Sequence, residues 1–130
     1  MPAPSDLAIA TKAVERLVKE EAFYRAELAK QQERVRQLAA EIAAANDPST
    51  LDGNAEFVLK QESRAVDETK AVFAPLKQRT AEAVSTLEQQ IAIREADAAD
   101  AQTDGAAVDD ELDKARAVLR TGQTAVAKEI

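Results

Sequence analysis

The sequence predicts an all-α protein, an antiparallel three-helix bundle built from long, coiled-coil-like helices. Apolar residues recur at spacings of three and four along most of the 130 residues, and only three Gly and four Pro interrupt the pattern. No run of alternating β-branched residues indicates a strand. Because short connections make successive helices neighbours, we expect one domain over residues 1–130, with helices at about 6–46, 54–98 and 108–127. A single long coiled coil is the alternative, but Pro48, Gly53 and Gly105 break the pattern where hairpins must turn.

The first helix is expected to begin after Ser5 and Asp6, which are good N-cap residues, and to continue to Asn46. Its apolar residues form a heptad seam, a stripe with a seven-residue repeat at which helices pack. The seam consists of Leu7, Val14, Leu28, Val35 and Ile42, with Ala10, Leu17, Tyr24, Leu38 and Ala45 three residues further on. Glu21 and Gln31 interrupt it with polar side chains. We expect both to weaken the core, so that replacing them with Leu raises thermal stability.

The second helix is expected after the turn-forming segment 46–54, which contains Pro48, Gly53 and several capping residues. Pro75 lies inside this helix, and the apolar spacing continues across it, so we expect a kink there and not a helix end. Most of the apolar residues of this segment fit a second seam: Phe57, Val58, Leu59, Val66, Val72, Phe73, Leu76, Val84, Leu87 and Ile91.

The third helix is expected beyond an Ala/Asp-rich stretch in which Thr103, Asp104 and Gly105 form the best candidate turn. Asp109 is well placed to cap its start. A shorter amphipathic stripe follows, formed by Val108, Leu112, Ala115, Leu119, Gly122 and Val126.

The composition argues against an enzyme. The chain has no His and no Cys, so it lacks the commonest general base, thiolate nucleophiles and the commonest metal ligands. Gly-rich phosphate loops and EF-hand spacings are absent. We expect the carboxylate clusters to be solvated helix ends, and we expect no catalytic site, no metal and no cofactor. These clusters are Asp97, Asp100 and Asp104, and then Asp109, Asp110 and Glu111.

Charge and hydropathy narrow the class of partner. A net charge of -7 opposes binding to nucleic acid or to an anionic membrane, and an aromatic content of 3% leaves few platforms for base stacking. The start, MPAPSD, lacks the pattern of a signal peptide, and no stretch is apolar enough to span a membrane. We therefore expect a soluble cytosolic protein.

Three stretches resemble one known family. VERLVKEE at 14–21, followed by Tyr24 and by QQE at 31–33, is similar to the first helix of tubulin-binding cofactor A, the tubulin-specific chaperone A family. The second helix of that family resembles NAE at 54–56, QESR at 61–64 and the interior Pro75, and the third resembles KARAVL at 114–119. The likeness spans about 6–120 and agrees with the three-helix architecture derived from the apolar pattern.

The resemblance implies a chaperone without nucleotide or catalytic site that captures β-tubulin and passes it on for assembly with α-tubulin. It implies a cytoplasmic monomer associated with the microtubule cytoskeleton, with other tubulin-folding cofactors as further candidate partners. Exposed residues of the matching stretch would meet the partner, and Phe23 falls outside the seam that contains Tyr24. The candidate partner-binding residues are Arg16, Lys19, Glu20, Phe23 and Gln32.

Two other classes of function remain open at this stage. A structural coiled-coil or scaffold module without a tubulin role explains the seams equally well, and a stable parallel dimer would favour it. A protein that lies on the membrane surface is the third class, and the acidic charge balance weighs against it.

Overall fold

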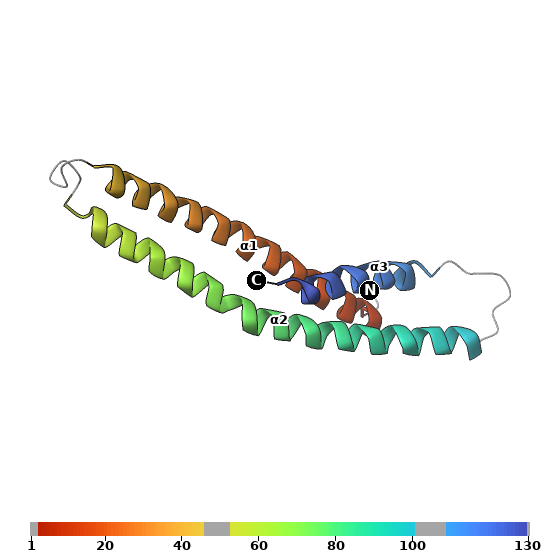
Figure 1. Cartoon of the computed structure of the whole chain (residues 1–130). Coiled ribbons are helices and arrows are strands. Elements are labelled where there is room, and N and C mark those ends of the chain that lie inside the picture. Colours follow the sequence, from red (N-terminus) through yellow and green to blue (C-terminus); the bar gives the residue numbers. More distant parts are fainter. Residues whose placement is uncertain (1–2, 46–52, 101–108, 130) are drawn as a thin grey trace. The chain divides into compact units, whose positions relative to one another are not determined.

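The chain is all-helical where its structure is described. A computed structural model describes residues 3–45, 53–100 and 109–129. Within them the chain forms α1 (Asp6–Ala44), α2 (Ala55–Asp100) and α3 (Asp110–Ala127), and no strand (Figure 1). The predicted fold class, all-α with three helices, is confirmed.

The contacts divide the chain into two compact units. Unit 1 comprises Met1–Glu21 and Ala74–Ile130, and unit 2 comprises Ala22–Phe73. The single-domain organisation expected from the sequence stays a prediction.

Capping side chains explain where α1 and α3 begin. Ser5 Oγ accepts a hydrogen bond from the backbone N–H of Ala8 at 3.0 Å. Asp109 has an extended backbone, and its Oδ1 accepts from the N–H of Leu112 at 3.1 Å. Both bonds satisfy donors that a helix start leaves unpaired, and both caps were predicted.

The connections between the helices fall mostly outside the described residues. Gly53 forms a turn with Asn54 directly before α2, as the sequence predicts. Pro48, Val108 and the expected turn at 103–105 lie outside the described residues.

The heptad seam predicted for α1 is confirmed, because its ten apolar residues are all buried or half-buried. Glu21 and Gln31 are also buried, each with 9% of its surface exposed. Glu21 has interaction partners, whereas Gln31 Oε1 accepts no hydrogen bond in the described structure. Thr11 is a further buried polar residue that the apolar pattern missed, and its hydroxyl donates to the Leu7 carbonyl at 2.7 Å.

Helix α2 continues through Pro75 as one element, with Phe73 and Leu76 buried on either side of the proline. Pro75 itself is exposed. The kink expected there stays a prediction. Phe57 and Val58 are exposed and therefore lie outside the seam of this helix. Thr69 and Thr80 occupy buried positions that an apolar pattern cannot reveal.

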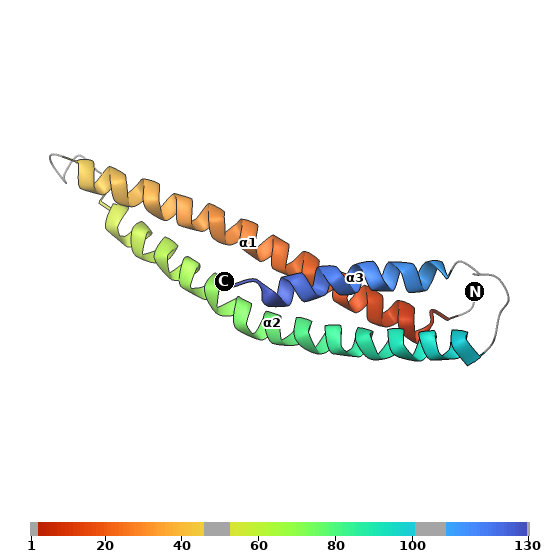
Figure 2. The same ribbon diagram turned by 45° about the vertical axis from the view of Figure 1, so that its right-hand side comes forward.

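Unit 1 is built from all three helices. Both views show α3, in blue, lying beside the first part of α1 and the second part of α2 (Figures 1 and 2). The helices approach closely at Gly122 of α3, since a Cβ built there would lie 2.7 Å from Val14 Cγ1 and 2.8 Å from Val84 Cγ2. The core consists of Leu7, Ala10, Val14, Val84, Leu87, Ile91, Leu112 and Ala115.

Outside residues 46–52, unit 2 is built from two helical segments, the later part of α1 and the first part of α2. Its seam is less completely covered, and most of its apolar residues are half-buried. Phe73 is the exception, at 3% exposed, and the guanidinium of Arg25 lies 5.5 Å from the centroid of its ring. Arg34 pairs across the two segments with Glu62 at 3.5 Å.

Adding a methyl group at Gly122 should destabilise the protein. Gly122→Ala removes a helix-propensity penalty of about 1 kcal/mol, but it forces the new Cβ against two buried valines, and overpacking costs about 1–3 kcal/mol. We expect a net loss in the free energy of unfolding, measured by urea denaturation. The exposed neighbour Thr121→Ala is the control and should change stability little. A more stable Gly122→Ala protein would contradict the close approach of the three helices.

Removing the buried amide of Gln31 should stabilise unit 2. Gln31→Leu replaces an acceptor that has no hydrogen bond with an apolar side chain of similar size, which should add about 1–2 kcal/mol to the free energy of unfolding. The same substitution at the exposed Gln61, also in unit 2, serves as control. Equal changes in melting temperature for both variants would show that burial of the Gln31 amide has no cost.

Candidate partner-binding surfaces

The five predicted residues lie on α1 and fall into both units. Arg16 and Lys19 are exposed in unit 1, where Glu20 is half-buried, whereas Phe23 and Gln32 are exposed in unit 2. The side chain of Phe23 is outside the seam, as expected from its register, and 63% of its surface is exposed. Its ring meets the Tyr24 ring edge-on, with centroids 5.3 Å apart. Four of the five side chains are therefore exposed and the fifth is half-buried. Their contact with a partner stays a prediction.

A groove in unit 1, the unit 1 groove, brings Lys19 together with α3. Its volume is about 280 Å³. The Lys114 ammonium lies 3.4 Å from Glu15 Oε1, an ion pair in which that buried oxygen accepts no hydrogen bond. Half-buried Val18 and Val118 supply its apolar lining. The lining residues are Glu15, Val18 and Lys19 of α1 and Lys114, Val118 and Thr121 of α3.

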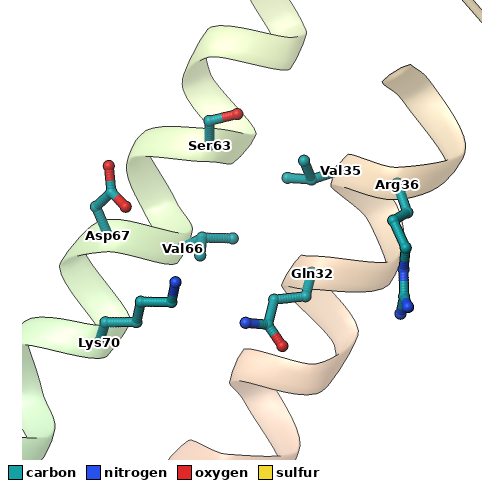
Figure 3. Close-up of a pocket in the computed structure, with 7 residues that line it drawn as sticks. All are labelled: Gln32, Val35, Arg36, Ser63, Val66, Asp67 and Lys70. Carbon is teal, nitrogen blue, oxygen red and sulfur yellow. The ribbon is translucent and has the colours of Figure 1, made fainter. Parts of the chain in front are cut away.

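A larger groove in unit 2, the unit 2 groove, is lined in part by Gln32. Its volume is about 490 Å³. Figure 3 shows Val35 and Val66 pointing toward each other from the two helices, with the Gln32 amide and the Lys70 ammonium extending into the space beside them. The lining residues are Gln32, Val35 and Arg36 of α1 and Ser63, Val66, Asp67 and Lys70 of α2.

Sequence reasoning missed the α2 and α3 sides of both grooves. Val66 was predicted as a seam residue, but Lys70, four residues further on, was not singled out. Residues four positions apart lie on the same side of a helix, and this spacing from Val66 is the signal that could have found Lys70. Lys114 was noted only as part of the family-like KARAVL stretch.

The grooves suit contact with a protein surface. Each groove is lined by two valines from facing helices together with charged side chains, and protein–protein contacts likewise combine apolar and polar surface. Among residues 3–45, 53–100 and 109–129, no group of three or more acidic side chains could hold a metal ion.

A polar cluster of unit 1, the clasp, is formed by Ser5, Arg94, Asp109 and Glu111. Ser5 Oγ donates to Glu111 Oε1 at 2.8 Å, and Arg94 donates to Asp109 Oδ2 at 2.9 Å and to Glu111 Oε1 at 3.2 Å. The clasp joins one residue at the start of α1, one in α2 and two at the start of α3. Its two carboxylates are engaged by protein donors, so it is a structural element.

The hydrogen bonds of the clasp shift the pKa of each ionised member. The Arg94 guanidinium holds the pKa of Asp109 below its ordinary value, and the Leu112 N–H acts in the same direction. The hydrogen bond from Ser5, followed by that from Arg94, lowers the pKa of Glu111. Asp109 and Glu111 in turn raise the pKa of Arg94.

Comparison with known families decides the class of the protein. The family model of tubulin binding cofactor A matches residues 2–119 of the 130-residue chain. The chain belongs to the tubulin binding cofactor A family. The match includes all of α1 and α2, both grooves except Thr121, and the whole clasp. No curated protein and no solved structure matches the chain.

Membership confirms the resemblance found in the sequence and gives tubulin as the class of partner. Tubulin binding cofactor A is a family of tubulin-binding chaperones and not a class of enzymes. Within the described ranges, no helix is both long and apolar enough to cross a membrane.

The clasp should make stability depend on acid pH. Because the pKa values of Asp109 and Glu111 are lowered in the folded protein, their stabilisation is complete above the ordinary values of 3.8 and 4.5 and is lost as pH falls through the lowered values. Arg94→Met should therefore lower the melting temperature at pH 7, and the difference from the wild type should shrink as pH falls below the ordinary values of these two carboxyl groups. Thermal melts of both proteins across this pH range measure it. A difference that persists in acid would assign the effect to packing of the Arg94 stem.

Proposed function

We propose that this tubulin-binding cofactor captures β-tubulin and hands it on for assembly of the α/β heterodimer. The family match over residues 2–119 carries this proposal, because it gives tubulin as the partner class. The exposed Phe23 and the two grooves support it, since a folding intermediate offers apolar and charged surface to such features. Capture requires no ATP or GTP hydrolysis by the cofactor.

Short-range contacts drive the binding. The cofactor carries a net charge of -7, and the family's partner is itself acidic, so long-range electrostatics oppose the encounter. Desolvation of exposed apolar groups such as Phe23, together with local basic groups such as Arg16 and Lys19, provides the affinity. Moderate salt screens the net repulsion and therefore leaves association unchanged or speeds it.

We also infer a monomeric, antiparallel bundle with a kink at Pro75, acting in the cytoplasm with the microtubule cytoskeleton. The side-chain pairs of unit 1 support the antiparallel order of α2 and α3. Arg94 of α2 pairs with Asp109 at the start of α3, and Glu88 of α2 accepts a hydrogen bond from Gln123 near the end of α3. Residue numbers of the contacts thus decrease along α2 as they increase along α3, which is the order of an antiparallel pair. Other tubulin-folding cofactors are further candidate partners.

Removing single exposed groups should weaken capture of β-tubulin and leave the fold unchanged. We expect Phe23→Ala to weaken capture, with Phe57→Ala as its control, since both rings are exposed in unit 2. We expect Lys19→Glu to do the same, with Lys12→Glu as its control on exposed α1 surface of unit 1. Each lost contact should cost about 1–2 kcal/mol of binding free energy. A pull-down probed separately for the α and β chains measures capture, and circular dichroism measures helicity.

The outcomes test the proposed capture function and the proposed contact residues separately. Full capture by Phe23→Ala and Lys19→Glu would exclude these side chains as contacts. Absence of β-tubulin capture by the wild type would overturn the proposal. A stable parallel dimer without capture would favour a scaffold module instead.

A further inference from the structure

The unit 2 groove lies on a helix pair that has no third helix of its own. Unit 2 comprises Ala22–Phe73, and its described residues form parts of α1 and α2 only. Val35 and Val66 are half-buried seam residues at this groove. In unit 1, where α3 is part of the core, Val14 and Leu87 of the corresponding seams are completely buried. Two facing helices thus leave apolar seam surface exposed that a third helix can cover.

The charge of the groove indicates the chemistry of the covering helix. The charged residues that line it are Arg36, Asp67 and Lys70. Arg36 is paired with Glu33 beside it on α1. Lys70 is exposed and has no ion pair in the described part of the chain, and its ammonium extends into the groove in Figure 3. A carboxylate is the group that complements this ammonium.

The unit 1 groove, considered by itself, has the same composition. Two valines from facing helices, Val18 and Val118, line it, with Lys19 and Lys114 beside them. The ammonium of Lys114 is already compensated by Glu15. The combination of facing valines with an adjacent lysine thus occurs in both units. Each groove lies between two helices, but in unit 1 a third helix contributes to the core, whereas the described residues of unit 2 form two helical segments.

We propose that the unit 2 groove receives an acidic amphipathic helix of the captured tubulin. An apolar side chain of that helix packs between Val35 and Val66, and a carboxylate near it pairs with the Lys70 ammonium. The incoming helix completes a three-helix arrangement, as α3 does in unit 1, and binds as helices bind in apolar grooves generally. Gln32 lies at the same groove and can donate a hydrogen bond to the incoming helix. This inference rests on the proposed capture of tubulin.

Two substitutions test the groove by independent means. Lys70→Glu reverses the uncompensated charge, and Lys60→Glu makes the same change in net charge on exposed α2 surface of unit 2, outside the groove. Ser63→Tyr places a ring in the groove, and the exposed Gln61→Tyr is its control. Affinity for purified β-tubulin is measured by titration, and helicity and melting temperature are measured on the same samples. We expect roughly tenfold weaker binding for Lys70→Glu and Ser63→Tyr and unchanged binding for both controls.

The outcomes show whether a tubulin helix or a second copy of the chain occupies the unit 2 groove. Unchanged affinity of both groove variants, with a wild type that binds, would overturn the groove and leave the capture function intact. No binding by the wild type would overturn the capture function itself. Sedimentation of the chain alone distinguishes a second copy as the occupant. A wild-type dimer that Ser63→Tyr converts to a monomer, with tubulin affinity unchanged, would overturn the tubulin helix as occupant.

Discussion

The close approach at Gly122 is the constraint on which the packing of unit 1 depends. Val14 and Val84 converge on this position from α1 and α2, and both are buried. A glycine inside a helix lowers helix stability by about 1 kcal/mol relative to alanine. Because it has no side chain, the two valines can pack directly against the backbone of α3. Two small residues of the same core, Ala10 and Ala115, are consistent with this short separation, since large side chains would hold the helices apart.

The clasp holds the start of α3, whereas the contact at Gly122 holds the helix near its other end. Most of the stability of a helix in a protein comes from packing of its apolar face, so α3, with 18 residues, depends on being held by its neighbours. Gly122 lies near its last turns, and Asp109 and Glu111 lie at its start, where Arg94 and Ser5 bind them. Acidic groups at a helix start also interact favourably with the helix dipole. Apolar packing and the polar clasp thus act on different ends of the same element.

Local chemistry explains how much of this structure could be predicted. Heptad periodicity identified the seam of α1, and the caps Ser5 and Asp109 were visible because capping involves residues three apart. The hydroxyls of Thr11 and Thr80 bond to carbonyls of their own helices, so these residues are buried despite being polar, which apolar counting cannot detect. The pairing of Arg94, and the place of Lys70 at a groove, depend on which helices meet. Such contacts are not local in sequence, and the candidate partner-binding residues taken from the family resemblance all lie on α1.

The difference in helix number between the two units has a consequence for dynamics. Local opening of a protein costs least where few apolar contacts hold a segment, so the two-helix unit 2 should exchange its amide hydrogens more readily than unit 1. A helix that binds in the unit 2 groove would then slow this exchange, because ligand binding stabilises only the closed form. A groove on the more readily opened unit can adjust to a partner that is itself still folding, while the core around Gly122 keeps its packing.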